Sequence, residues 1–371
     1  MEQIIFRPRI YQYDGANDFA EAYSLSERDL VLTNRYIFEP YFDTEKYPVR
    51  CIFQEEFGSG EPTDIMVDAI LKKAQEAAFD RVIAIGGGTV LDIAKILAVA
   101  DGHDVNWLYD HKEALQRSQK LILIPTTCGT GSEITNISIV NRTTKGVKMG
   151  LTSESMYADA AVLIPELLQK LPFGVFATSS IDALVHAVES YLSPKATDYT
   201  RLFSRRAMEM ILTGYQTLLA EGKDQLPTMM EQFLRASNFA GLAFGTAGCA
   251  AVHAMSYPLG GTYHVPHGES NYAMFTGVLK QYLMLKPEGD ITELNNYLAQ
   301  LLHCEATEVY DALELLLNQI LPKKALHEYG VKPEELAVFA DSVMQTQGRL
   351  MANNYVPLDR EQVYQIYRSL Y

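Results

Sequence analysis

The sequence changes character near residues 171–174, Leu-Pro-Phe-Gly, and this change constrains the fold more than any other feature. Before it, short apolar runs alternate with helical patterns, and after it we find almost no strand-like run. Four apolar runs predict buried strands: residues 30–33, 82–85, 121–124 and 161–164. Helical spacing of apolar residues predicts helices over 64–79 and 89–100. Alternating strands and helices indicate a mostly parallel sheet that helices cover on both faces.

The second half of the chain consists of long helical patterns. We predict helices at about 178–193, 198–221, 225–247, 268–285, 290–302, 305–320, 333–346 and 359–370, with ends uncertain by about two to four residues. The sequence therefore predicts two domains. Residues 1–173 form an α/β domain with a parallel sheet, and residues 174–371 form an all-helical domain.

Composition excludes several classes of function. The net charge of −15 argues against a nucleic-acid partner and against binding to an anionic membrane surface. The four cysteines are scattered and form no CxxC pair, which indicates reduced thiols and a cytoplasmic location. The N-terminal residues lack the apolar segment of a signal peptide. The most apolar stretch, residues 82–100, is interrupted by three glycines, Asp92 and Lys95, so we expect no membrane span there.

A glycine turn follows the second of the predicted strands and opens a helix. Its sequence is Gly86-Gly-Gly-Thr89. Glycines let backbone N–H groups approach a phosphate closely, and a helix N-terminus adds free donors and a positive dipole end. Asp92 is expected in the first helical turn, where an acid is favoured. The alternative is a tight turn without a ligand, because the motif is not the GxGxxG fingerprint of a Rossmann fold.

A second loop, residues 125–133, follows the next predicted strand and is rich in hydroxyl groups. It reads Pro-Thr-Thr-Cys-Gly-Thr-Gly-Ser-Glu. The alternative is a helix start with Thr130 or Ser132 as its N-cap. Two such loops at the carboxyl ends of strands match the place where open α/β sheets bind nucleotides. We therefore predict that the parallel sheet binds a nucleotide.

Four side chains of the helical half suit a divalent transition metal. Asp182 and His186 are four residues apart, which places both on one face of a helix. His253 and His267 bound a segment with two glycines and two prolines, which predicts a rigid, kinked loop between helices. One carboxylate and three imidazoles can bind Fe(II) or Zn(II). Two alternatives to this ligand set remain at this point. Asp182 could cap its helix instead of binding a metal, and His264 lies as near in the sequence to the other candidates as His267 does.

Together these motifs resemble the iron-containing (group III) alcohol dehydrogenase family over essentially the whole chain. The segments that carry the resemblance are residues 86–92, 125–133, 182–189 and 253–268. Within the family, residues 53–62, 265–269 and 353–357 resemble 4-hydroxybutyrate dehydrogenases. The resemblance implies a dehydroquinate-synthase-like fold and, commonly, a homodimer.

The resemblance also implies roles for individual residues. It implies that the metal ligands are Asp182, His186, His253 and His267, with His264 outside direct coordination. The implied contacts to NAD(P) come from Gly87, Gly88, Thr89, Thr126, Thr127, Thr130 and Lys148.

The implied activity is that of a metal-dependent, NAD-linked alcohol dehydrogenase that interconverts 4-hydroxybutyrate and succinic semialdehyde. Its partners would be a small hydroxy acid and the matching aldehyde. The alternatives are a general short-chain primary alcohol or polyol dehydrogenase, a lyase of the dehydroquinate-synthase type, and a nucleotide-binding regulatory protein with a structural metal.

Two residues depart from the pattern of many family members. Tyr257 stands where many members have a further histidine near the nicotinamide, so Tyr257, His264 or a water would relay the proton. Asn34 follows the first predicted strand, where many NAD-preferring members carry aspartate, so we expect NAD, with NADP second. Donors for the substrate carboxylate are expected among Tyr257, His264, Arg349 and Asn353, the last two being placed on one face of a helical turn.

Overall fold

The computed structural model describes residues 3–371 and divides into two compact units. Phe6–Leu171 form an α/β unit, and Pro172–Tyr371 form a helical unit that also includes residues 3–5. The chain is thus divided after Leu171, near the boundary predicted at residue 173. Each unit is described by itself below.

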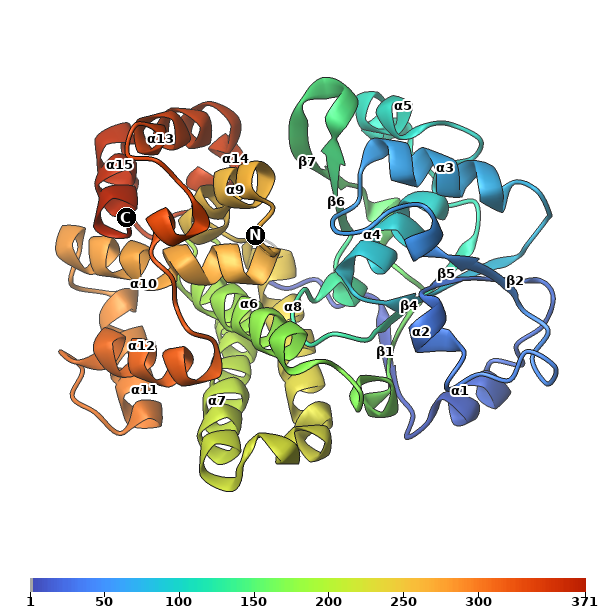
Figure 1. The fold of residues 1–371 in the computed structure, drawn as a ribbon, viewed down its shortest axis with the longest axis horizontal. Helices are drawn as coiled ribbons and strands as arrows, with labels where there is room; N and C mark the ends of the chain where they lie inside the picture. Colours follow the sequence, from blue (N-terminus) through green and yellow to red (C-terminus); the bar gives the residue numbers. More distant parts are fainter. Residues whose placement is uncertain (1–2) are drawn as a thin grey trace. The chain divides into compact units, whose positions relative to one another are not determined.

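The α/β unit is built on a six-stranded, wholly parallel sheet with the order β1-β8-β5-β4-β2-β3 (Figure 1). Its strands are β1 (Arg9–Gln12), β2 (Asp29–Thr33), β3 (Arg50–Phe53), β4 (Arg81–Gly86), β5 (Lys120–Pro125) and β8 (Ala160–Leu163). The helices of this unit are α1 (Ala16–Ala22), α2 (Arg35–Phe38), α3 (Asp64–Ala74), α4 (Gly88–Leu97) and α5 (Val105–Asp110). The predicted α/β class with a parallel sheet is confirmed.

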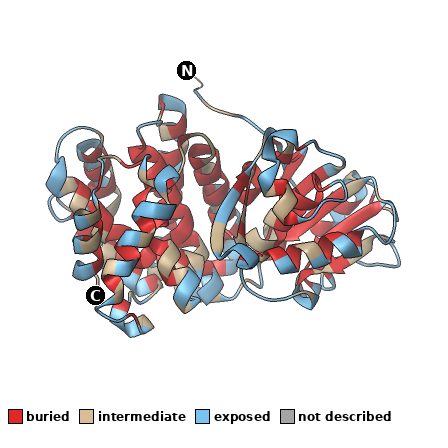
Figure 2. Cartoon of the chain, turned by 90° about the horizontal axis from the view of Figure 1, so that it is seen from above, coloured by how far each residue is buried: buried red, intermediate tan, exposed pale blue. Residues whose placement is uncertain are grey.

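The strand order brings the carboxyl ends of β2, β4 and β5 next to one another, where the predicted nucleotide-binding loops begin. The chain goes from β2 outward to β3 and then returns past β2 to β4, β5 and β8. The direction therefore reverses between β2 and β4, and open α/β sheets bind ligands outside the carboxyl ends of strands at such a point. Strands β2, β4 and β8 are almost wholly buried, and Figure 2 colours such buried segments red. Apolar residues on both faces of a strand are what a covered parallel sheet requires.

A hairpin that we did not predict leaves the sheet after β5. It consists of β6 (Ile137–Arg142) and β7 (Val147–Thr152), paired antiparallel. Asp92 ties α4 to this hairpin, because its carboxylate accepts from the backbone N–H of Ile139 at 2.8 Å. The prediction that Asp92 lies in the first helical turn is wrong. The helix begins at Gly88, so Asp92 is one residue beyond that turn.

Ten α-helices make up the described part of the helical unit. They are α6 (Phe173–Leu192), α7 (Asp198–Glu221), α8 (Met230–Ala247), α9 (Ala251–Tyr263), α10 (His267–Leu285), α11 (Asp290–Leu302), α12 (Val309–Ile320), α13 (Glu335–Thr346), α14 (Gly348–Met351) and α15 (Arg360–Ser369). Helix α6 packs against α7, α8 and α10, and residues 180–192 are buried without interruption. A helix that is buried all round forms the centre of such a unit.

Helix α9 corrects the predicted loop. Residues 251–263 are helical although Pro258 lies inside them, so the prediction of a kinked loop from 253 to 267 is wrong for most of its length. Proline in a helix interior removes one backbone hydrogen bond and costs about 3 kcal/mol. The first six residues of α9 are almost wholly buried, and this burial offsets the cost. A short break follows, in which His264 adopts a left-handed conformation (φ 54°) before α10 begins.

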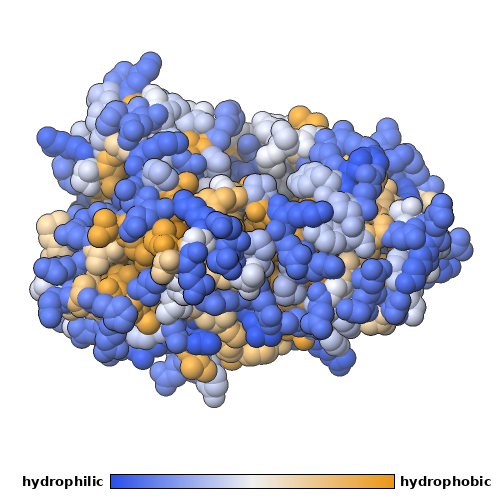
Figure 3. Space-filling model, turned by 60° about the horizontal axis from the view of Figure 1, so that its bottom comes forward, coloured by the Kyte–Doolittle hydropathy of each residue, from blue (hydrophilic) through white to orange (hydrophobic). Residues whose placement is uncertain are grey.

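Hydrophilic side chains dominate the face of the molecule that Figure 3 shows, with apolar patches between them. Exposed apolar residues such as Met284 and Leu315 are normal on protein surfaces. In the described part of the chain, no single helix has the length and apolar character to span a membrane. One strongly bent pair, Lys223–Ala247 with Ala251–Tyr263, meets the criterion by length and composition alone.

Candidate metal centre and nucleotide-binding loops

Three helices each present two polar side chains spaced four residues apart. The pairs are Asp182 and His186 on α6, His253 and Tyr257 on α9, and His267 and Asn271 on α10. Residues at this spacing lie on the same helix face. Helix α10 packs against both α6 and α9, so the three faces can meet.

The structure brings the four predicted metal ligands together. The Nε2 atoms of His186 and His253 lie 2.9 Å apart. Asp182 Oδ1 lies 3.8 Å from the Nε2 atom of His253 and 3.8 Å from that of His267. Asp182, His186 and His253 are buried, whereas 30% of the His267 side chain is exposed. The donor set is therefore convergent and open on the His267 side, although its role as a metal site stays a prediction.

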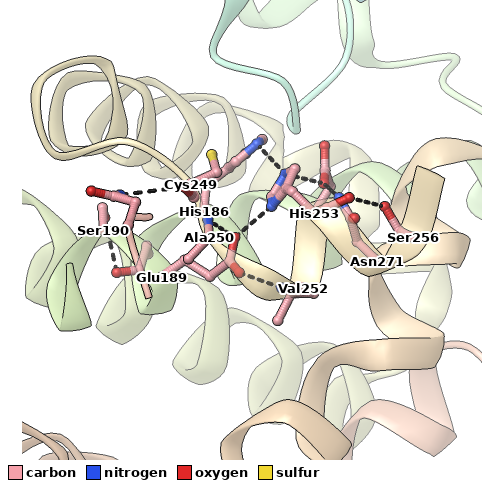
Figure 4. A network of polar contacts seen from close by, with 12 residues as sticks. His186, Glu189, Ser190, Cys249, Ala250, Val252, His253, Ser256 and Asn271 are labelled. Atoms are coloured by element: carbon pink, nitrogen blue, oxygen red, sulfur yellow. Dashed lines mark hydrogen bonds and ion pairs between the residues drawn. The ribbon is translucent and has the colours of Figure 1, made fainter. Parts of the chain in front are cut away.

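The hydrogen bonds around His253 fit a bound divalent metal. Its Nδ1 atom lies 2.6 Å from Glu189 Oε2, inside the network of Figure 4. An ionised carboxylate can only accept, so Nδ1 carries a hydrogen, and Nε2 is the ring nitrogen that faces His186 and could bind a metal. Metal-bound histidines commonly donate their other ring N–H to a carboxylate in this way. The donors are also of the kinds that Fe(II) and Zn(II) accept.

Glu189 has a structural role that the sequence alone did not reveal. Besides His253, its carboxylate accepts from the backbone N–H of Ala250 at 3.0 Å and of Val252 at 2.6 Å. The carboxylate thereby satisfies free N–H donors at the N-terminus of α9, and its negative charge interacts favourably with the positive end of the helix dipole. A signal was present, because Glu189 follows Asp182 by seven residues and thus lies on the same face of α6.

Asn271 holds a second of the predicted metal ligands, Asp182. Its Nδ2 atom donates to Asp182 Oδ1 at 2.7 Å and lies 3.2 Å from His267 Nε2. Asn271 is fully buried, one helical turn after His267. The spacing from His267 was the available signal for this residue.

Mutual interactions among the charged groups of this site shift their pKa values. Burial raises the pKa of Asp182, but the neighbouring imidazoles of His186, His267 and His253 outweigh burial, so the pKa is lowered overall. Burial lowers the pKa of His253, but Cys249 and Glu189 raise it well above its ordinary value. Protons held by these imidazoles must leave when a metal binds, so metal affinity should fall in acid.

Cys249 was not among the predicted site residues, yet it lies at this cluster. Burial raises its pKa, but the imidazoles of His253 and His186 outweigh burial and bring the pKa to about 7. No spacing pattern pointed to this cysteine, because Cys249 precedes α9 rather than lying on a helix face.

The two predicted proton-relay residues lie in different environments. Tyr257 is half-buried, and its ring centroid lies 6.3 Å from that of His267. His264 is exposed, and it is not among the convergent donors that include Asp182, His253 and His267 in the described residues. The geometry favours Tyr257, and both assignments stay predictions.

The two late residues proposed to bind a substrate carboxylate do not share a helix face. Arg349 is exposed in α14, which ends at Met351, so Asn353 lies beyond the helix. Asn353 is buried, and its Nδ2 atom donates to Ala247 O at 2.7 Å and Cys249 O at 3.3 Å. Because both amide hydrogens are committed to the backbone, the prediction that Asn353 binds substrate is wrong.

The two predicted phosphate loops lie against each other in the α/β unit. Gly87 is the N-cap residue of α4, and no side chain caps this helix among the described residues. A Cβ atom on Gly88 would lie 2.8 Å from Thr130 Cγ2, and one on Gly87 would lie 3.3 Å from Thr127 Cγ2. The backbone N–H of Thr126 donates to Gly86 O at 3.0 Å. An uncapped helix N-terminus beside a hydroxyl-rich loop fits a phosphate group.

The remaining predicted cofactor residues reach a neighbouring loop. Thr89 Oγ1 donates to Gly60 O at 3.0 Å, and Lys148 Nζ lies 2.7 Å from Glu61 Oε1. The alternative of a Thr130 or Ser132 N-cap is not what forms, since Gly131 caps the short 3₁₀ turn at 132–134. The assignment of these residues to a cofactor stays a prediction.

Asn34 has an acidic neighbour at the carboxyl ends of two adjacent strands. It follows β2, and its Nδ2 atom donates to Glu55 Oε2 at 2.9 Å. Glu55 follows the neighbouring strand β3 and also accepts from the backbone N–H of Arg35 at 2.7 Å. The proximity of Glu55 to Asn34 could not be predicted from the sequence, because strand β3, which precedes Glu55, was not predicted.

Comparisons with known proteins agree with this geometry. The family model "Iron-containing alcohol dehydrogenase" matches residues 17–165, and "Fe-containing alcohol dehydrogenase family, C-terminal" matches residues 176–371. The 4-hydroxybutyrate dehydrogenase of Clostridium kluyveri is 44% identical over 371 residues, which is 100% of both chains.

Two solved structures share the fold at low sequence identity. A 1,3-propanediol oxidoreductase superposes with a TM-score of 0.86 at 21% identity and covers 100% of both chains. The sulfoacetaldehyde reductase of Bifidobacterium kashiwanohense, determined in complex with NAD+, has a TM-score of 0.84 at 22% identity. That match covers 100% of this chain and 99% of the other.

Proposed function

This chain belongs to the iron-containing alcohol dehydrogenase family, and from this premise we propose that it interconverts 4-hydroxybutyrate and succinic semialdehyde. The observation that carries the substrate is the 44% identity to a 4-hydroxybutyrate dehydrogenase over the whole length of both chains. We further propose Fe(II) as the metal, NAD as the cofactor and a homodimer as the assembly. Asp182 converges with His253 and His267, and His186 Nε2 lies 2.9 Å from His253 Nε2, which supports the metal.

A metal at these residues would act as a Lewis acid on the substrate oxygen, and NAD would carry the hydride. The chain's own residues have supporting tasks. Glu189 fixes the orientation of His253, and Asn271 fixes the carboxylate of Asp182. Tyr257, half-buried next to His267, can pass a proton between the substrate hydroxyl and solvent.

The carboxyl edge of the sheet supports NAD over NADP. Glu55 places a carboxylate beside Asn34, at the end of the strand where an acidic residue commonly bonds the adenine ribose. The cation of Arg35 is already paired with Glu39 at 2.8 Å and Glu56 at 2.8 Å. A 2′-phosphate would therefore meet an uncompensated negative charge in Glu55.

The test is the steady-state rate of NADH formation by the iron-loaded protein with 4-hydroxybutyrate and with butan-1-ol. The two substrates share a four-carbon chain with a terminal hydroxyl, and only the first has a carboxylate. A charge-assisted hydrogen bond to that carboxylate contributes roughly 1.5–3 kcal/mol, so kcat/KM should be about ten- to hundredfold higher for 4-hydroxybutyrate.

Equal efficiency for the two substrates would contradict the proposal and favour a general short-chain alcohol dehydrogenase. Net accumulation of NADH would exclude a lyase that uses NAD only transiently.

A further inference from the structure

Cys249 forms a second group of convergent donors with two of the predicted metal ligands. The Sγ atom of Cys249 and one nitrogen each of His186 and His253 all lie within 4.8 Å of one another. In a tetrahedral zinc site, bond lengths of about 2.0–2.3 Å place the ligand atoms roughly 3.3–3.8 Å apart. The cysteine and the two histidines are therefore close enough to share an ion after small side-chain shifts.

The backbone around Cys249 is held on both sides, so its position is a built feature. Gly248 has a φ of 79°, a conformation that favours glycine, and its N–H donates to Phe244 O at 2.6 Å. Asn353 donates to the carbonyl oxygens of Ala247 and Cys249. Glu189 accepts from the next N–H, that of Ala250. These two hydrogen bonds account for the burial of Asn353, because its side chain holds the turn around Cys249.

We propose that Cys249, His186 and His253 form an alternative metal position that captures thiophilic divalent ions such as Zn(II) and Cd(II). The proposal rests on the same two histidines as the proposed iron site. It goes beyond that site because it assigns a sulfur ligand and predicts competition between metals.

The chemistry distinguishes the two positions. The group of Asp182, His253 and His267 offers oxygen and nitrogen, which suit Fe(II), whereas a thiolate favours softer ions. On binding, Cys249 loses its thiol proton to solvent and the sulfur forms the bond to the metal. Because both positions use His253, an ion at the sulfur position excludes one at the other. Zinc should thus displace iron rather than add to it.

Cobalt(II) provides a direct readout that does not depend on activity. The metal-free protein is titrated with Co(II) while its near-ultraviolet and visible absorption is recorded. The wild type should show a thiolate-to-cobalt charge-transfer band. Cys249→Ser should bind cobalt without that band, and Cys304→Ala should keep it, since Cys304 is a partly exposed cysteine outside both donor groups.

Zinc affinity, measured with a competing chelator, gives a second readout. Loss of the hydrogen-bond partner of a metal ligand typically weakens metal affinity by roughly 10–100-fold. Cys249→Ser removes a direct ligand, so the affinity for Zn(II) should fall by at least this factor. The affinity for Fe(II) should change less than that for Zn(II) in Cys249→Ser.

Two results would overturn the proposal: a wild-type cobalt spectrum without a thiolate band, or a band that persists in Cys249→Ser. If either occurs in a protein that forms NADH from 4-hydroxybutyrate when loaded with iron, the inference fails and the proposed function stands. A thiolate band in a protein without dehydrogenase activity would support the inference and contradict the proposed function.

Discussion

At the scale of single residues, Glu189 links the helix framework to the chemistry. One carboxylate fixes the ring of His253 and caps the helix that carries it. Replacement by glutamine should expose this double role. Glutamine keeps one oxygen, but its NH₂ group would face an N–H donor where a second acceptor is needed.

We predict that Glu189→Gln weakens metal binding by about 10–100-fold, the range typical for partners of ligating histidines. Metal affinity is measured by titration against a chelator, with unfolding followed separately by circular dichroism. The control is Glu305→Gln, an exposed glutamate of the same unit. Unchanged affinity in Glu189→Gln would show that His253 is not oriented through this carboxylate.

Glu55 gives a second prediction at this scale. Two unit charges about 4 Å apart in water interact by about 1 kcal/mol, so removal of the Glu55 charge should favour NADP by roughly fivefold. The measurement is the ratio of kcat/KM for NADP to that for NAD in Glu55→Gln. The control is Glu45→Gln, because Glu45 is an exposed glutamate of the same unit, and the pairing of Arg35 with Glu56 is left intact. The cofactor argument fails if both variants leave the ratio unchanged or shift it equally.

At the scale of elements, Asp64 joins helix α3 to the hairpin. Its carboxylate accepts from the backbone N–H of Thr143 at 3.0 Å and of Thr144 at 3.2 Å, and from both hydroxyl groups. Burial raises the pKa of Asp64, but the hydrogen bonds from Thr144 and Thr143 outweigh burial and lower the pKa to about 2. An unfolded aspartate has a pKa of about 3.9.

Because the folded pKa is the lower one, the Asp64 carboxylate contributes stability above about pH 4, and this contribution is lost as the pH falls toward 2. Asp64→Asn should therefore lower the free energy of unfolding at pH 7 by about 1–3 kcal/mol. The difference from wild type should shrink below about pH 4. Urea unfolding at pH 7, 5 and 3 measures it, with exposed Asp14→Asn as control. A difference that stays constant to pH 3 would contradict the role of the charge.

Local patterns in the sequence predicted elements with regular apolar spacing and missed elements that are exposed or interrupted by proline and glycine. Helices 198–221 and 290–302 were predicted to the residue, because each has clear amphipathic spacing and well-marked ends. Strand β1 was missed because its four residues are all exposed and show no apolar run. Helix α9 was missed because Pro258 and two glycines resemble a loop, and only tertiary burial keeps them helical.

At the scale of the whole molecule, the two predicted functions fall into different units. The glycine turn and the threonine loop belong to Phe6–Leu171, and the four predicted metal ligands belong to Pro172–Tyr371. Spacing along helices sufficed to predict Asp182 with His186. Cys249 had no such signal, because it meets the two histidines only where the start of α9 contacts Glu189 of α6. Because the predicted cofactor loops and the predicted metal ligands belong to different units, we expect that removing the metal abolishes turnover without abolishing NAD binding.

The most direct test of the central claim is the metal content of two histidine variants. Elemental analysis of iron-loaded His267→Ala and His264→Ala is combined with NAD affinity and NADH formation. We expect His267→Ala to lose most of its iron and its activity while it still binds NAD, and His264→Ala to keep its iron. If His264→Ala loses the metal and His267→Ala retains it, the assignment of the metal centre to Asp182, His186, His253 and His267 is wrong.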